Sequence, residues 1–136
     1  MGAKIKKHDY IFAVGRRRTS VARVRLYKGK NQHLVNEKPI GQYFSGVEEQ
    51  KLWNNPFILT KTEGKYYITA KVQGGGKKGQ LGAVIHGTAR ALVKAIEDSK
   101  LTLRQAGLLT RDSRTRERRK IGTGGKARRA KQSPKR

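Results

Sequence analysis

Residues 66–98 read YYITAKVQGGGKKGQLGAVIHGTARALVKAIED, in which a strand pattern, a glycine break and a helix pattern follow one another. Aromatic or aliphatic residues occupy every second position from Tyr66 to Val72, which predicts a strand with one buried face. From Gln80 to Asp98 apolar residues recur every three or four positions, which predicts a helix with one wide apolar face. These residues are Leu81, Val84, Ile85, Ala89, Leu92, Val93 and Ile96. A long helix covering a sheet is therefore the expected centre of the fold.

The preceding sequence supplies the other expected strands. Residues 10–14 form an apolar, β-prone run, and residues 19–27 alternate between apolar and basic side chains, with Arg23 and Arg25 on the basic face. Gly29 begins a turn signal, and residues 34–36 predict a short partner strand. We therefore expect a small antiparallel sheet in the first third of the chain.

Short helices are expected on both sides of the 66–72 strand. Pro39 suits a first helical position, and residues 45–48 fit a capping box that opens a helix ending near Pro56. Residues 101–106 predict a further helix that Gly107 ends. The expected fold class is α/β, an α+β sandwich of two layers.

The 136 residues suit one folded domain with charged extensions. We expect a basic N-terminal arm at 1–9, a globular domain at 10–109 and an extended basic tail at 110–136. The tail holds twelve Lys or Arg, two acidic residues and a single large aliphatic, Ile121. Such a segment buries too little apolar surface to order by itself, so it needs a densely negative partner.

The charge of the whole chain points to nucleic acid. Lys and Arg number 33 against 9 acidic residues, for a net charge of +24, and residues 1–109 keep +14 of it. Each neutralised phosphate releases a counterion and adds affinity. The chain has no cysteine, which excludes disulfides and zinc fingers. It also has neither an apolar run that spans a bilayer nor a signal peptide, so we expect a soluble intracellular protein. A membrane surface is a weaker rival partner, because the tail lacks an apolar stripe.

Two motifs are candidate phosphate contacts. Residues 74–80, GGGKKGQ, lie between a strand and a helix, where backbone N–H groups and the helix dipole favour an anion. The spacing matches neither GxxxxGK[ST] nor GxGxxG, so Lys77 and Lys78 are expected to contact an RNA phosphate rather than a nucleotide, with a solvated turn as the alternative. Residues 16–18 place three arginines at the entry of a strand, and the guanidinium group suits phosphate.

Catalysis finds little support in the sequence. The three histidines, His8, His33 and His86, lie far apart, and the acidic residues form no paired or metal-binding set. No serine has a nucleophile-elbow context. We expect neither an enzyme nor a bound cofactor or metal.

Four segments resemble the S-nine family of small-ribosomal-subunit proteins, in its bacterial or organellar type. They are VGRRRTSVARVRLYKGKN (14–31), VNEKPIGQYF (35–44), VQGGGKKGQLGAVIHGTARAL (72–92) and AGLLTRDSRTRERRKIGTGGKARRAKQSPKR (106–136). The resemblance implies a fold like the second domain of ribosomal protein S-five, with a left-handed βαβ crossover. It also implies a structural role in the small-subunit head, within cytoplasmic or organellar ribosomes, on ribosomal RNA and beside neighbouring head proteins.

The resemblance further implies which residues bind RNA. Ribosomal RNA binding falls to Arg16, Arg17, Arg18, Arg23, Lys77, Lys78, Arg111, Arg114, Arg116, Arg118, Arg119, Lys120, Lys126, Arg128, Arg129 and Lys131. During translation the tail would reach the anticodon stem-loop of the peptidyl-site tRNA, with Lys135 and Arg136 as the contacting residues.

The chain departs from the family pattern at two places. Its last residues are Gln132-Ser133-Pro134-Lys135-Arg136 where the family usually ends Gln-Phe-Ser-Lys-Arg, so an aromatic is absent. Ile85 stands where the family usually has an arginine.

Two other function classes use the same residues. A free nucleoid or RNA-chaperone-like protein would bind DNA and RNA alike, with steep salt dependence. A nuclease or NTPase would need Lys77 and Lys78 to bind nucleotide.

Overall fold

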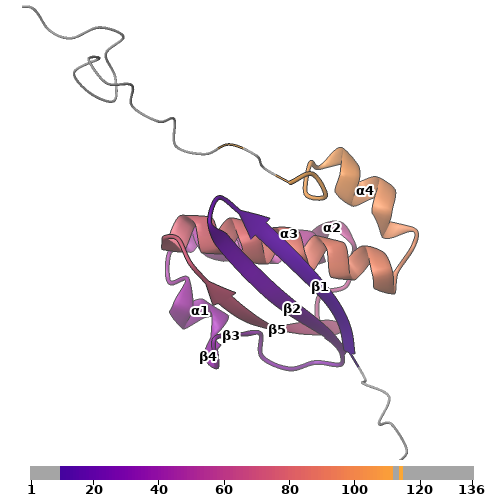
Figure 1. Cartoon of the computed structure of the whole chain (residues 1–136). Coiled ribbons are helices and arrows are strands. Elements are labelled where there is room, and N and C mark those ends of the chain that lie inside the picture. The colour runs from indigo at the N-terminus through magenta and orange to yellow at the C-terminus, as the bar shows by residue number, and fades with distance from the viewer. Residues whose placement is uncertain (1–9, 112–113, 115–136) are drawn as a thin grey trace, which may run out of the picture.

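The computed structural model describes residues 10–111 and Arg114, and its described part is a mixed sheet packed against helices (Figure 1). The strands are β1 (Tyr10–Arg17), β2 (Ser20–Lys28), β3 (Leu34–Val35), β4 (Lys38–Pro39) and β5 (Tyr66–Gln73). The helices are α1 (Ile40–Tyr43), α2 (Val47–Leu59), α3 (Lys77–Ala95) and α4 (Ser99–Gln105). Both long strands expected from alternation, β2 and β5, are confirmed.

The strand order is β1-β2-β5-β3-β4. The centre of the sheet is antiparallel, since β2 pairs with both β1 and β5 in that sense. The expected place of residues 34–36 in an antiparallel sheet of the first third was wrong in part. β3 pairs in parallel with β5 and antiparallel only with the short β4, because α1 and α2 carry the chain from β3 to β5.

The helix α3 crosses one face of the sheet against β1 and β2 (Figure 1). The alternating strand residues that point to it are buried, as are most residues of its predicted apolar face. The core includes Ala13, Ala22, Val24, Leu26, Ile68, Ala70, Val72, Leu81, Val84, Ala89 and Leu92. α2 and α4 pack against α3, so the described helices leave the opposite face of the three long strands open.

Two glycines allow α3 to lie directly on β1. A Cβ placed on Gly15 would overlap the carbonyl oxygen of Ala83 and the backbone of Gly87. A Cβ on Gly87 would lie 2.6 Å from Val24 Cγ2 and 3.0 Å from the Gly15 nitrogen. Real Cβ atoms do not approach other atoms so closely, so the helix and the strand touch through backbone here.

Three side chains of α3 bond to the outer edge of β1. Lys94 Nζ donates to the Phe12 carbonyl at 2.8 Å, and Arg90 Nη1 donates to the Val14 carbonyl at 2.7 Å. His86 Nδ1 accepts the Arg16 N–H at 3.4 Å. Four residues of a helix rise about 6 Å and two residues of a strand about 6.7 Å. Every fourth residue of α3 therefore lies opposite every second residue of β1.

Helix boundaries differ from the sequence prediction where glycine or proline is involved. α2 runs through Pro56 to Leu59, and the expected end near Pro56 was wrong. Thr60 Oγ1 donates to the Pro56 carbonyl at 2.8 Å and closes this last turn. α3 begins at Lys77 rather than Gln80, because Gly76 is its N-cap. Gly107 follows α4 with φ +77°, as a helix-ending glycine does.

Candidate nucleic-acid interface

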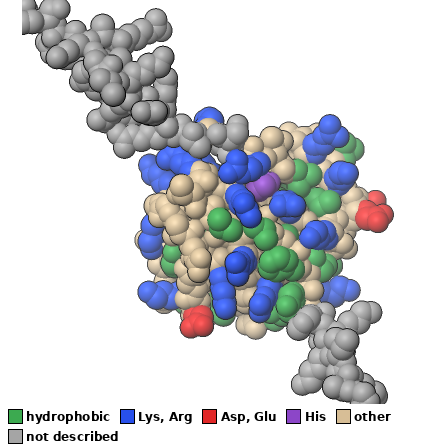
Figure 2. Space-filling view, viewed as in Figure 1, with side chains coloured by type: hydrophobic (Ala, Val, Ile, Leu, Met, Phe, Trp, Pro, Cys, Tyr) green, Lys and Arg blue, Asp and Glu red, His purple; other side chains and the backbone are tan. Residues whose placement is uncertain are grey.

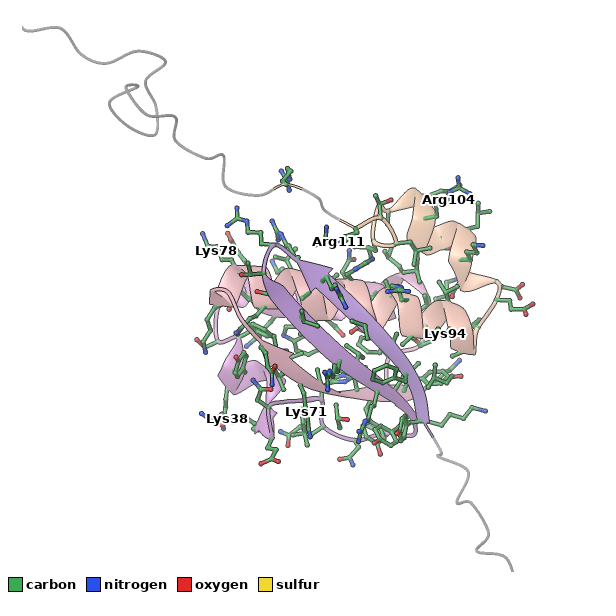
Figure 3. All side chains as sticks on the ribbon, viewed as in Figure 1. Lys38, Lys71, Lys78, Lys94, Arg104 and Arg111 are labelled. Carbon is green, nitrogen blue, oxygen red and sulfur yellow. The ribbon has the colours of Figure 1, made fainter. Side chains whose placement is uncertain are left out.

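The β1–β2 turn and the glycine loop before α3 pack together. Ser20 Oγ donates to the Gly74 carbonyl at 3.0 Å, and a Cβ on Gly74 would lie 2.6 Å from the Thr19 carbonyl oxygen. Arg18 occupies the turn with φ +53° and is exposed. Two segments 54 residues apart in sequence therefore pack together at the end of α3 where Figure 3 labels Lys78. We call Arg16, Arg17, Arg18, Lys77, Lys78 and Arg111 the hairpin-end cluster.

Two members of this cluster are also engaged with the protein. Lys77 Nζ donates to the Tyr43 carbonyl at 2.9 Å and lies 4.2 Å from the centroid of the Tyr43 ring. The half-buried Arg17 lies along α3, where its side chain occupies the space above Gly82. Arg16, Arg18, Lys78 and Arg111 are exposed, and so is Lys77 apart from its contacts with Tyr43.

His86 joins the start of the tail to β1. Its Nδ1 accepts from the Arg16 N–H, so its Nε2 carries the proton and donates to the Leu109 carbonyl at 3.2 Å. Burial lowers the pKa of His86, the Leu109 hydrogen bond raises it, and the charges of Arg90 and Arg111 lower it further. Arg111 therefore lies close to the Arg16 end of β1, although 95 residues separate them in sequence.

A second basic surface lies on the open face of the sheet. Arg23 and Arg25 of β2 are exposed there, and Lys71 of β5 is the register partner of Arg23. Figure 2 shows basic side chains mixed with hydrophobic ones on the viewed face. The sequence prediction included Arg23 but omitted Arg25 and Lys71 from the binding residues. Arg25 and Lys71 could have been recognised from the sequence, because the alternation that places Ala22, Val24 and Ala70 in the core places their neighbours on the open face.

The predicted RNA-binding residues thus fall into several groups. Residues 16–18, 77 and 78 lie at the hairpin end and Arg111 lies near His86, whereas Arg23 lies on the open face. Arg114 is described and exposed. The remaining candidates lie outside the described residues: Arg116, Arg118, Arg119, Lys120, Lys126, Arg128, Arg129, Lys131, Lys135 and Arg136.

Metal-ligand clusters and membrane-spanning helices are both absent from the described residues 10–111. Within residues 10–111, no three His, Asp or Glu side chains gather as metal ligands would. No helix in that range has the length and apolar character needed to cross a bilayer.

Comparison with known proteins identifies the family. Residues 15–136 match ribosomal protein S9/S16. The chain belongs to this family. It is 46% identical over 132 residues to the small ribosomal subunit protein uS9 of Dehalococcoides mccartyi strain 195, covering 97% of this chain and 99% of the relative. The uS9 proteins of strains BAV1 and CBDB1 match over the same lengths at 46% and 45% identity.

Family membership confirms the resemblance that the sequence motifs carried. The protein is a structural, non-enzymatic ribosomal protein that takes part in translation. It is a component of the ribosome. The basic surfaces are therefore parts of a ribosomal protein, not of an enzyme or a nucleoid protein.

Proposed function

We propose that this protein is a structural constituent of the small-subunit head and binds small-subunit ribosomal RNA through its described domain. The name of its relatives, small ribosomal subunit protein uS9, supports the first half. The net charge of +24 and the two basic surfaces support the second. A-form RNA gives side chains little access to base edges in its deep groove, so phosphate contacts and shape carry most of the binding.

The hairpin-end cluster is the proposed main phosphate contact. Its strongest support is the packing of the β1–β2 turn on the glycine loop, which fixes Arg18 and Lys78 near each other. Backbone N–H groups of the first turn of α3 lie at the same end, and no acidic residue occupies that turn. Anions are favoured at such helix starts.

The domain division and the finer fold are proposals too. The arm is residues 1–9, the globular domain 10–109 and the tail 110–136. We expect the β3–α2–β5 connection to be the left-handed crossover of an S-five-like domain, which an experimental structure of the subunit would check. Neighbouring head proteins are the proposed protein partners.

Gradient sedimentation of a cell lysate tests the proposed function. Tagged protein is expected to migrate in stoichiometric amount with small subunits after a high-salt wash. The reason is that salt weakens non-specific electrostatic binding more than it weakens a specific RNA interface. Complete release into light fractions would contradict the proposal and leave a non-specific polyanion binder.

The tail is proposed to support tRNA at the peptidyl site. Replacing Lys135 and Arg136 together by Ala is expected to weaken binding of peptidyl-site tRNA while leaving subunit assembly intact, because two cations leave the tail tip. Filter binding of tRNA to purified subunits measures this effect. Wild-type tRNA affinity in the double variant would remove the tail from the mechanism.

A further inference from the structure

Side chains on the open face of the sheet stand in register across four strands. Phe12 of β1 pairs with Arg25 of β2, Arg25 pairs with Thr69 of β5, and Thr69 pairs with Leu34 of β3. The next row runs from Val14 through Arg23 to Lys71. Apolar and basic side chains therefore mix along these rows.

Most residues of these two rows line an open hollow of about 330 Å³. Its lining includes Phe12, Arg23, Arg25, Thr69 and Lys71, together with Glu37 as its acidic residue. Phe12 is 44% exposed, which is unusual for a phenylalanine in a sheet, and Thr69 has a side chain short enough to leave room above it. Pockets for small planar ligands begin at about this size.

A tyrosine row beside the hollow holds one of the arginines. Tyr27 stacks on Tyr67 at a ring-centroid distance of 5.1 Å, and Tyr10 packs on Tyr27 at 5.5 Å. The guanidinium carbon of Arg25 lies 4.9 Å from the Tyr10 centroid. Arg25 is therefore positioned by a cation–π contact before any ligand arrives.

We propose that this hollow binds an unpaired nucleotide of RNA, with the base against Phe12 and the adjoining phosphates on Arg23, Arg25 and Lys71. The inference rests on the proposed ribosomal RNA binding and specifies the kind of RNA that this face takes. Stacking on an aromatic ring and cations for the backbone are the two means by which proteins hold single strands.

The chemistry of the face favours an unpaired nucleotide over a duplex or a protein. A duplex keeps its bases stacked inside, so it would meet the cations but leave Phe12 exposed. A protein partner would need acidic side chains to match three cations around one hollow. A single-stranded nucleotide supplies both a planar apolar base and negative charge.

Fluorescence binding with the full-length protein tests this site. The probes are a single-stranded RNA heptamer with a central 2-aminopurine and the same strand annealed to its complement. Phe12→Ala is expected to weaken binding of the single strand by about 5- to 150-fold and to abolish the fluorescence quenching that stacking causes. Phe12→Tyr keeps a ring and is expected to retain quenching. Residues 110–136 contain no aromatic side chain, so the tail offers no ring on which the 2-aminopurine could stack.

Two controls separate stacking from charge and from folding. Lys100→Gln removes an exposed cation on α4, on the helical side, and is expected to leave quenching unchanged. Circular dichroism verifies that each variant is folded. Quenching that is equal in wild type and a folded Phe12→Ala would overturn the inference, as would equal effects of Phe12→Ala on single strand and duplex.

Ultraviolet crosslinking of intact small subunits provides a second test that needs no variant. We expect the peptide that contains Phe12 to crosslink to a nucleotide that is unpaired in the subunit. If the protein sediments with small subunits and crosslinks to RNA only through the hairpin end, the inference fails while the proposed function stands. A crosslink of this face to another protein would also overturn it. Absence from small subunits would instead overturn the proposed function.

Discussion

Gly87 has no room for a side chain, although a helix interior normally favours alanine over glycine. Gly87→Ala gains about 1 kcal/mol of helix propensity. The added methyl meets Val24 and the backbone of Gly15, and such overpacking costs about 1–3 kcal/mol or more when backbone must move. We expect a net loss of up to about 2 kcal/mol in the free energy of unfolding, measured by urea denaturation.

Gly82→Ala is the matched control at the residue scale. The atoms that its methyl would meet belong to the Arg17 side chain, which can swing away. We therefore expect unchanged or slightly higher stability, together with weaker RNA binding if Arg17 contacts phosphate from its present position. Equal destabilisation by both substitutions would contradict the proposed contact between Gly15 and Gly87.

His33 makes stability depend on pH. It accepts the Ile68 N–H at 3.1 Å through Nδ1 and stacks on Phe57 at 4.8 Å, and burial lowers its pKa. Because the unfolded chain takes up the proton first, this contribution is complete above about pH 6.5 and is lost as pH falls toward the folded pKa. Urea midpoints are expected to fall between about pH 7.5 and about pH 5.5. His33→Gln should reduce the pH dependence of stability and leave only the contribution of His86. A wild-type stability that does not change with pH would contradict this role of His33.

At the scale of elements, α3 protects the edge of β1. An unpaired strand edge is a template for association with another chain. Removing Arg90 and Lys94 together leaves the Phe12 and Val14 carbonyls without these donors. The double alanine variant is expected to lose about 1–2 kcal/mol of stability, reduced by solvent exposure of both bonds, and to scatter more light on heating. Arg104→Ala, on exposed α4, is the control that should change neither quantity.

Local periodicity explains which elements could be predicted from the sequence. Alternation in β2 and β5 and the apolar face of α3 depend on neighbours two to four residues away, so they were predicted correctly. The pairing of β3 with β5 depends on how α2 crosses the sheet, which no local pattern encodes. Among candidate binding residues, Arg18 and Lys78 were recognisable as cations, but their meeting at one end follows from packing of the turn on the glycine loop.

At the scale of the whole molecule, much of the positive charge lies outside the described residues. Residues 112–136 hold eleven of the 33 basic residues, whereas the side chains of the described core, from Ile11 to Leu109, lie before them. We therefore expect folding and much of the RNA affinity to depend on different parts of the chain. Stability should respond to core substitutions and salt-dependent binding to tail substitutions.

A chain ending at Arg111 tests this separation while keeping the bond between His86 and the Leu109 carbonyl. We expect it to unfold cooperatively, with a free energy within about 0.5 kcal/mol of the full-length protein, because no side chain of the described core is removed. Its RNA affinity should fall. A plot of the logarithm of the binding constant against the logarithm of the salt concentration should become shallower, its slope falling in magnitude by about 0.7 to 0.9 for each phosphate that the tail no longer neutralises. Loss of cooperative unfolding would show that residues beyond 111 complete the fold. An unchanged salt slope would show that the tail does not bind RNA when the protein is outside the ribosome.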